Sequence, residues 1–249
     1  SKKVGGLASG AQAQGGNAMY LGDKIYNSGL IGIALSGDIE VDTIVAQGCR
    51  PIGEPMQITK CEHNLLKELG GKPPLEVLQG LNGTLSDEDK KLIQSSLFLG
   101  IEMDPMKDNP QQGDFLIRNL MGVDRESGSV AIGALLRNGQ LVQFHLRDKK
   151  MSAEDLDVML TRYLTQGNAE NAKGALLFSC LGRGEYLYGK PNHDTDMFQG
   201  KLGKIPLGGF FCNGEIGPVG KTTFLHGYTS SFGIFRSARR QRDAGPNDQ

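Results

Sequence analysis

Short apolar runs separated by turn residues fill the first half of the chain. Runs of this length, bounded by Gly, Asn, Asp or Ser, are typical of β-strands. The pattern predicts a hairpin over Asn17–Tyr26 with its turn at Gly22-Asp23, then two strands, Leu30–Leu35 and Ile39–Ala46. Further strands are predicted over Met56–Thr59, Asn64–Leu69, Leu97–Met103, Asp114–Met121, Ser129–Leu136, Leu141–Leu146 and Gly174–Cys180.

Helical signals are fewer and lie between the blocks of strands. Acidic residues follow Ser86, so it is expected to cap a helix that runs to about Ser96, because carboxylates are favoured at the positive end of the helix dipole. Ser152 opens the clearest helical period. Shorter helices are expected over Leu75–Leu81 and Asp194–Lys201. The apolar face of the helix that Ser152 opens consists of Leu156, Met159, Leu160, Tyr163 and Leu164.

The order of these elements predicts the fold class. Consecutive strands joined by short turns, such as Arg137-Asn-Gly-Gln140, indicate antiparallel sheet. The helices are grouped between strand blocks, which favours an α+β protein with mainly antiparallel sheets flanked by helices over a doubly wound α/β fold. A sandwich of two sheets with helices outside is one architecture of this class.

The most informative segment runs from Gly208 to Thr229. An alternating apolar run stops at a polar cluster, Gly217-Pro218 predicts a turn, and a second strand returns. Glycines along the segment allow close backbone approach. Binding groups tend to lie at strand ends, so the segment predicts one wall of a pocket. Its polar side chains are Cys212, Asn213, Glu215, His226 and Thr229.

Composition narrows the functional class. The chain has 249 residues, 38% of them hydrophobic, with 36 Gly and no Trp, which is ample for one or two packed domains. A formal net charge of −1 argues against a nucleic-acid binder. The longest apolar runs, such as Leu30–Leu35, are too short to span a membrane, and no signal peptide is visible.

The two ends of the sequence and its cysteines add three expectations. Ser1-Lys-Lys-Val-Gly-Gly reads as a strand entering a turn, which predicts that part of a fold precedes it. Residues 237–249 hold almost no apolar side chains and are expected to form a disordered tail. The four cysteines lack a CxxC spacing, which favours free thiols in a reducing compartment, with a structural disulfide as the alternative.

Cys180 and Cys212 each end an apolar strand, and each is followed by a glycine-containing turn. If the two strands are neighbours, the turns converge and bring Arg183 near Glu215. The planar Arg183 guanidinium would bind a carboxylate, and Glu215 would bind an amine. This pair of opposite charges predicts a site for a small zwitterion such as an amino acid. The alternative is an Arg183–Glu215 salt bridge that only closes the sheet edge.

Three other chemistries are less well supported by the residues. Gly217-Pro-Val-Gly-Lys-Thr222 resembles the end of a phosphate-binding loop, but Glu215 occupies the position of the required glycine and strand-like residues follow. A catalytic thiol would pair Cys180 or Cys212 with His226 as its base across the hairpin, but no third, orienting residue is evident. No metal-ligand spacing is recognised, so neither a metal nor a cofactor is expected.

These segments together resemble the FIST family, named for F-box proteins and intracellular signal-transduction proteins. The residues from Gly5 to Gln47 are similar to the end of the family's N-terminal domain. The resemblance implies a sensory module for small metabolites, amino acids in particular, and stand-alone forms of photosynthetic lineages look like the nearest relatives. The other segments that carry the resemblance are Gly48–Gly53, Phe115–Asp124, Val142–Asp148, Leu177–Gly184, Gly209–Pro218 and Leu225–Thr229.

The residues and the resemblance together predict a domain division and a function. Residues 1–47 are expected to end an N-terminal FIST domain, 48–236 to form the C-terminal FIST domain, and 237–249 to be the tail. The predicted function is non-catalytic sensory binding of a small polar or zwitterionic ligand. The expected ligand-contacting residues are Cys180, Arg183, Gly184, Cys212, Asn213, Gly214, Glu215, His226 and Thr229.

The alternative function is a scaffold or interaction protein, for example in a photosynthetic membrane-associated assembly. The expected partner is an amino-acid-like small molecule, with a protein partner and peripheral membrane association as alternatives, and no nucleic acid. The expected location is intracellular, either cytoplasm or the plastid stroma of a photosynthetic eukaryote.

Overall fold

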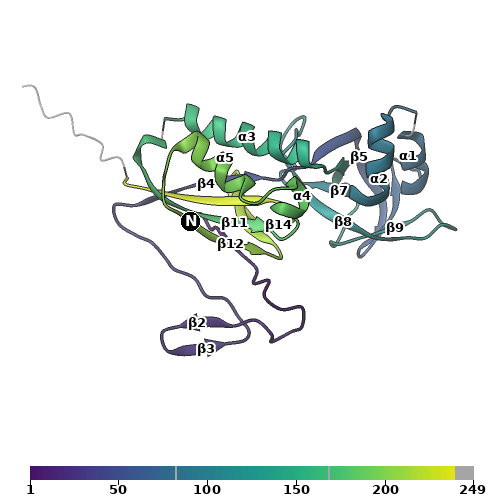
Figure 1. The fold of residues 1–249 in the computed structure, drawn as a ribbon. Helices are drawn as coiled ribbons and strands as arrows, with labels where there is room; N and C mark the ends of the chain where they lie inside the picture. Colours follow the sequence, from purple (N-terminus) through teal and green to yellow (C-terminus); the bar gives the residue numbers. More distant parts are fainter. Residues whose placement is uncertain (82, 168, 239–249) are drawn as a thin grey trace, which may run out of the picture.

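The computed structural model describes residues 1–81, 83–167 and 169–238. A four-stranded sheet and a closed barrel organise most of this part of the chain, and helices pack against both (Figure 1). Within it, β11 and β12 form the one parallel pair, and all other strand pairs are antiparallel. The predicted α+β class with mainly antiparallel sheets is therefore confirmed.

The four-stranded sheet has the order β12 (Leu207–Cys212), β11 (Ala172–Cys180), β15 (Ser230–Arg236) and β4 (Glu40–Ala46). Helices α3 (Lys149–Thr165) and α5 (His193–Leu202) lie along one face of it (Figure 1). Each large apolar side chain buried there contributes roughly 1.5–3 kcal/mol through its removal from water. The core between sheet and helices includes Ile44, Leu156, Leu160, Leu177, Phe198, Phe232 and Ile234.

A smaller sheet covers the opposite face of the four-stranded sheet. Its order is β1 (Gly5–Gly6), β13 (Glu215–Val219) and β14 (Thr222–His226). At Gly217 the packing is so close that a Cβ would lie 2.6 Å from Ser231 Oγ and 2.7 Å from a Val45 methyl. Two sheets face to face with helices outside is the layered arrangement expected from the sequence.

The second body is a closed barrel with its own core, an architecture that the sequence analysis did not predict. Helices α1 (Pro74–Leu81) and α2 (Asp87–Ser96) pack on it. Its interior is apolar and includes Ile58, Leu66, Leu99, Ile132 and Phe144. In spatial order the strands are β10 (Leu141–Leu146), β5 (Arg50–Glu62), β6 (Leu65–Leu69), β9 (Val130–Ile132), β8 (Phe115–Val123) and β7 (Leu97–Glu102).

An extended arm between β1 and β4 leaves the body of the protein (Figure 1). It carries the predicted hairpin, now seen as β2 (Met19–Leu21) and β3 (Lys24–Tyr26), with Gly22-Asp23 at the turn. The strand predicted over Leu30–Leu35 is wrong, because these residues form no strand and Leu30 is 88% exposed. The apolar pattern of Leu30–Leu35 alone could not show that no other strand pairs with this segment.

Two helix starts test the capping predictions. Ser86 caps α2 as expected, since its Oγ accepts a hydrogen bond from Asp89 N at 3.1 Å. The start predicted at Ser152 is wrong by one turn, because Asp148 caps α3 by accepting from Met151 N at 2.7 Å. Ser152 is instead buried and donates to Gly48 O at 3.0 Å.

Two predicted turns lie in a different setting from the one expected. The Arg137–Gln140 turn forms, but β9 pairs with β6 and β8 while β10 pairs with β5 and β7, so it closes no hairpin. Gly217-Pro218 lies inside β13, and the chain turns at Gly220-Lys221 into β14. The phosphate-loop lookalike is therefore strand–turn–strand.

Two further observations concern the predicted C-terminal tail and the length of the helices. Of the predicted disordered tail, residues 239–249 lie outside the described residues. None of the helices in the described ranges is long and apolar enough to cross a membrane.

Candidate functional site

The carboxyl ends of β11 and β12 lie side by side. Cys180 stands opposite Cys212 in the parallel register, so the two glycine-containing turns are neighbours. The start of β15 joins the same end, because Cys180 N donates to Thr229 O at 2.9 Å. Polar side chains gather here, where the strands pass into turns, which often carry binding groups. We call them the sheet-end cluster: Ser179, Cys180, Arg183, Asp194, Cys212, Glu215 and Ser230.

Arg183 is the largest fully buried side chain, with 1% exposure. Its partner is Asp194 rather than Glu215: Nε and Nη2 donate to the carboxylate at 2.8 and 3.1 Å. Nη2 also donates to Tyr188 Oη at 2.6 Å. In the described residues, Nη1 of Arg183 is buried and has no hydrogen-bond partner. The alternative of an Arg183–Glu215 salt bridge is wrong, since the cation is already paired with Asp194.

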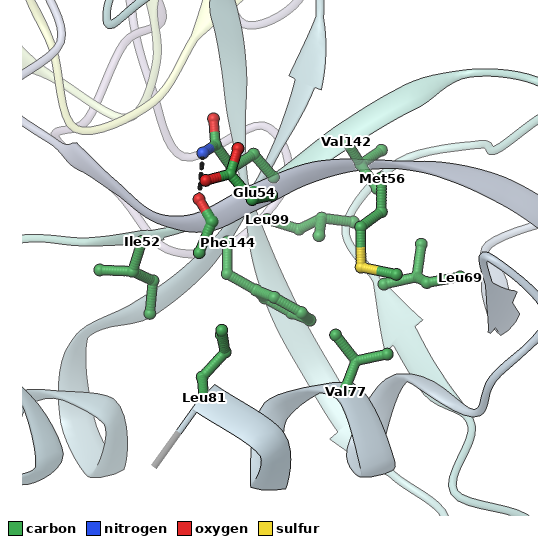
Figure 2. Close-up of a pocket in the computed structure, with 11 residues that line it drawn as sticks. Ile52, Glu54, Met56, Leu69, Val77, Leu81, Leu99, Val142 and Phe144 are labelled. Atoms are coloured by element: carbon green, nitrogen blue, oxygen red, sulfur yellow. Dashed lines mark hydrogen bonds between the residues drawn. The ribbon is translucent and has the colours of Figure 1, made fainter. Parts of the chain in front are cut away.

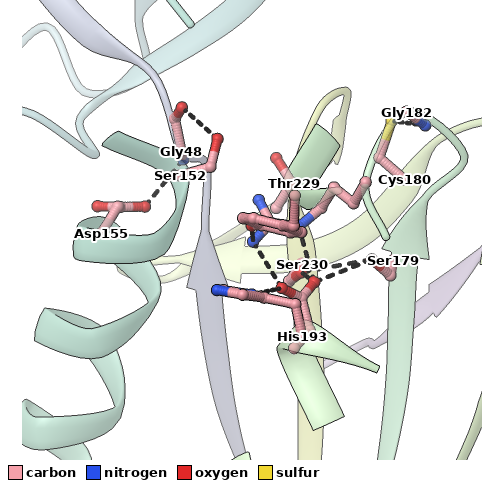
Figure 3. Close-up of polar contacts among 12 residues, drawn as sticks. Gly48, Ser152, Asp155, Ser179, Cys180, Gly182, His193, Thr229 and Ser230 are labelled. Atoms are coloured by element: carbon pink, nitrogen blue, oxygen red, sulfur yellow. Dashed lines mark hydrogen bonds and ion pairs between the residues drawn. The ribbon is translucent and has the colours of Figure 1, made fainter. Parts of the chain in front are cut away.

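Asp194, at the first turn of α5, organises one side of the cluster. Its Oδ2 accepts hydrogen bonds from Ser179 Oγ and Ser230 Oγ at 3.2 and 2.6 Å. Figure 3 shows these serines and His193 around one carboxylate. Burial opposes ionisation, but hydrogen bonds from His193, Arg183 and Ser230 and the Arg183 charge prevail, so the pKa of Asp194 is well below its usual value. The carboxylate is therefore ionised and saturated with donors.

Glu215 is fully buried at the start of β13. Its carboxylate accepts from Thr229 N at 3.1 Å and contacts Cys212 Sγ at 3.7 Å. Burial raises the pKa of Glu215 to about 7, although these hydrogen bonds and the charges of Arg183 and Arg147 act in the opposite direction. Glu215 thus changes its charge near neutral pH and has no cationic hydrogen-bond partner in the described residues.

The cysteine thiols form no disulfide, and burial makes three of them harder to ionise. All four cysteines are unbridged, which agrees with the prediction of free thiols. Burial raises the pKa of Cys49 and of Cys212 to about 12, and it raises the pKa of Cys180 as well. A nucleophilic cysteine needs a stabilised thiolate, which is the opposite condition.

Among the described residues, His226 makes no hydrogen bond to Cys212, which the catalytic-thiol alternative would require. It pairs across the β13–β14 ladder with Glu215, and its Nε2 lies 3.0 Å from Gly217 O. The Asn213 side chain is exposed, and its Nδ2 donates to Ala8 O at 3.5 Å instead of to the cluster. Gly214 accepts from Leu7 N at 2.8 Å. Of the predicted ligand-contacting residues, the structure brings Cys180, Arg183, Gly184, Cys212, Glu215 and Thr229 to the sheet end.

The sequence analysis missed Ser179, Asp194 and Ser230 of the sheet-end cluster, and two residues beside it, Arg147 and Cys49. Arg147, which follows β10, donates from Nη2 to Gly182 O at 3.1 Å and lies 5.1 Å from the Tyr228 ring centre. Its Nε is buried without a partner in the part of the chain described. Cys49 follows β4 and belongs to a small core with Phe98. A polar residue directly after an apolar strand was the available signal for Arg147.

Comparison with known families decides what kind of chain this is. A model of the FIST N domain matches residues 1–72, and a model of the FIST C domain matches residues 74–218. Together they cover most of the chain. The chain belongs to the FIST family. FIST domains are generally taken as small-ligand sensory domains in signalling.

Relatives of this FIST chain occur in bacteria and in a plant. Uncharacterized protein Rv0628c of Mycobacterium tuberculosis and uncharacterized protein Mb0898c of Mycobacterium bovis are each 39% identical over 232 residues, covering 93% of this chain and 60% of the relative. The F-box/LRR-repeat protein At5g63520 of Arabidopsis thaliana is 30% identical over 115 residues, which is 40% of this chain and 22% of that protein. The chain spans about 60% of the mycobacterial relatives.

The two FIST models meet inside the barrel. Strands β5 and β6 fall in the FIST N match, whereas β7 to β10 fall in the FIST C match. The chain itself passes from the four-stranded sheet to the barrel at residues 47–50. The predicted division at residues 47 and 48 stays a prediction, as does the resemblance to photosynthetic lineages.

Two hollows among the described residues bear on where a ligand could bind. A groove of about 490 Å³ lies over β12 beside the start of α5 and borders the sheet-end cluster at Ser179 and Asp194. A second hollow, in the barrel, has a volume of only about 30 Å³ (Figure 2). Its walls are apolar residues such as Phe144 and Val77, and this volume holds little more than a water molecule. The barrel hollow is therefore a packing defect rather than a ligand site.

Proposed function

We propose that this FIST chain is a non-catalytic sensory module that binds a small polar or zwitterionic, amino-acid-like ligand at the sheet-end cluster. The observation that carries the proposal is the buried Nη1 of Arg183, which has no acceptor among the residues that the structure describes. A buried donor without a partner costs roughly 1–3 kcal/mol, and more when charged. A ligand carboxylate that accepts from Nη1 would remove that cost.

The surroundings of Nη1 limit the ligand to a small group. A Cβ at Gly48 would lie 3.0 Å from Nη1 and 2.8 Å from Ser152 Oγ, so the Gly48 backbone packs closely against Nη1 and leaves no room there for a bulky group. Gly48 also has φ of 69°, which favours glycine. Two residues on the first turns of α3 hold Gly48 in place: Ser152 Oγ donates to Gly48 O, and Asp155 Oδ2 accepts from Gly48 N (Figure 3).

Glu215 is proposed to receive the amine of the ligand. A buried carboxyl whose pKa is raised to about 7 gains most from a cation, because a neighbouring positive charge restores its ionised form. The Arg183 charge lowers the pKa of Glu215, although burial prevails, and this interaction supports a site that involves both groups. Opposite charges at one site suit a zwitterion.

The position of the cluster supports a sensory role. Arg147 reaches from the end of the barrel to Gly182 in the turn after β11, and Cys49 and Tyr228 pack with barrel residues such as Phe98. A ligand at this junction would contact groups that belong to the sheet and groups that belong to the barrel. Differential contacts of this kind are what couple binding to a change between two bodies.

Calorimetry against a panel of amino acids and small metabolites tests the proposal. We expect a ligand whose binding is lost in Arg183→Lys, which keeps a cation beside Asp194 but deletes Nη1, and weakened at least tenfold in Glu215→Gln. Arg137→Lys, at an exposed arginine, is the control and should bind as the wild type does. No binding at millimolar concentrations, or equal binding by all variants, would overturn the proposal.

A scaffold role is the second candidate, and the arm favours it. Its apolar side chains are unusually exposed: Tyr20 68%, Ile25 61% and Ile33 88%. Contiguous apolar exposure marks interaction surfaces. Under this reading Ile25→Ser with Ile33→Ser removes a co-purifying protein, whereas Arg183→Lys only lowers stability. Retention of every co-purifying protein by the arm variant would exclude this function.

A further inference from the structure

Strand β12 ends the four-stranded sheet with a free edge and two poorly covered faces. Its neighbour is β11, and no second strand pairs with it in the described ranges. The side chains of Phe210 and Phe211 are 46% and 49% exposed, on opposite faces of the sheet. Natural proteins usually protect such an edge with charges or proline, because it is a template for another strand. Residues 205–214 contain no charged side chain, and their proline, Pro206, precedes β12 and directs its carbonyl to β11, so it does not block the free edge.

Backbone hydrogen bonds show which groups of β12 point outward. Pro206 O accepts from Ala175 N and Cys212 O accepts from Leu181 N, so even-numbered residues face β11. Odd-numbered residues therefore direct their N–H and C=O to the free edge. Phe211 O already accepts from Ser9 Oγ at 2.5 Å. The remaining outward residues are Leu207 and Gly209.

We propose that two copies of the chain pair antiparallel through β12 about a two-fold axis at Gly208. In this register Leu207 of one copy exchanges two hydrogen bonds with the partner's Gly209, and the symmetric pair adds two more. The two four-stranded sheets become one sheet of eight strands. Residues 5–9, which occupy the edge beyond Phe211, stay where they are.

Side chains on both faces fit this register. On the sheet face that β1 covers, Gly208 lies opposite the partner's Gly208. Phe210 lies opposite the partner's Pro206, so the two phenylalanine rings flank the gap that the two glycines leave. On the helix face, the Leu207 side chain covers the partner's Gly209, which has no side chain to clash. Leu207 and Gly209 both line the groove of about 490 Å³. The partner thus supplies a wall to the groove's open side.

The size of the contact sets the expected strength. One short strand pair and two phenylalanine rings bury less surface than a permanent dimer needs. We therefore expect a reversible dimer with dissociation in the micromolar range. The proposal is independent of ligand binding at the sheet-end cluster, because β12 pairs through its edge and the cluster lies at its end.

Analytical ultracentrifugation of the wild-type chain from about 1 to 200 µM tests the pairing. We expect a monomer–dimer equilibrium, and at least a tenfold weaker dimer in Gly208→Glu, which places two carboxylates opposite each other. A Cβ at Gly208 would meet only Leu176, at 3.8 Å, so the monomer tolerates the change. The control is Gly122→Glu, another exposed strand glycine with open space around it. A wild-type chain that stays monomeric, or a Gly208→Glu dimer of unchanged strength, overturns the proposal.

Cross-linking tests the register separately. Pro206 and the partner's Phe210 form a non-hydrogen-bonded pair, whose Cα atoms lie about 4.5 Å apart, within reach of a disulfide. The double variant Pro206→Cys with Phe210→Cys should give a covalent dimer under mild oxidation. Each single variant should not, because its two new thiols are far apart along the strands. Equal cross-linking of the single variants would contradict this register.

Discussion

Arg183 donates two hydrogen bonds to Asp194, a carboxylate 11 positions further along the chain. The pair joins the turn after β11 to the first turn of α5, and through Ser230 it also reaches β15. Three elements of the sheet–helix layer are thus fixed at one buried point. A buried ion pair of this kind is costly to break, because the remaining charge keeps its desolvation penalty without its partner.

Removal of one partner should therefore be strongly destabilising. We expect Arg183→Ala or Asp194→Asn to lower the free energy of unfolding by about 3–5 kcal/mol, measured by urea denaturation. Lys90→Ala, at an exposed ion pair with Asp87, should change it by less than about 0.5 kcal/mol. A loss below about 1 kcal/mol in both cluster variants would contradict a buried, mutually dependent pair.

Glu215 should make stability fall as the pH rises towards neutrality. Its pKa in the folded chain is raised to about 7 from 4.5, so the folded state holds a proton that the unfolded state releases between these values. This contribution is fully present below about pH 4.5 and lost as the pH rises through about 7, and it amounts to about 3 kcal/mol.

The comparison with Glu215→Gln isolates that contribution, because His226, whose pKa is lowered by burial, acts in the opposite direction over part of the same range. The difference between the two unfolding free energies should change between pH 4.5 and 7 and stay level above pH 8. Parallel profiles for the two proteins would show that Glu215 titrates normally.

Gly209 should tolerate no side chain. A Cβ there would lie 1.9 Å from Leu177 O, a backbone atom of β11, and the residue has φ of 150°. We expect Gly209→Ala to disrupt the β11–β12 pair and to lower the free energy of unfolding by about 3 kcal/mol or more. Gly122→Ala should cost less than about 0.5 kcal/mol, since nothing lies within 4 Å of its Cβ position. Similar thermal melting of the two variants would refute the close approach.

The cysteines should react slowly. Burial raises the pKa of the Cys49, Cys180 and Cys212 thiols, so few thiolates form at neutral pH. With iodoacetamide at pH 7, followed by mass spectrometry, Cys49 and Cys212 should be modified only after unfolding. Rapid modification of any one of these three in the folded chain would restore the catalytic-thiol alternative.

Local signals in the sequence predicted local structure well. Ser86, followed by acidic residues, identified the start of α2, and Gly22-Asp23 identified the turn between β2 and β3. The pairing of distant segments could not be predicted from such local signals. An alternating apolar pattern indicates that a strand exists, but it does not indicate which strand lies beside it. The barrel depends on β5 pairing with β10, far along the chain.

The partner of Arg183 was missed for the same reason. The turn after β11 and the segment at Glu215 both carried visible charges, which suggested that they pair with each other. Asp194 stood in the first turn of a predicted helix, where an acidic residue is ordinary. Only the crossover through α5 between the parallel strands β11 and β12 brings its carboxylate back over Ser179.

Arg50 and Leu146 stand opposite each other in the β5–β10 ladder, so the barrel begins and ends at neighbouring points. Residues 50–146 therefore behave as a cassette inserted between β4 and α3, with a core of their own. All strands of the four-stranded sheet lie outside this cassette, so its length does not affect the order of strands in that sheet. Cys49 and Arg147 lie next to the two ends of this cassette, at residues 50 and 146. A change of the cassette would therefore also alter the wall of the sheet-end cluster.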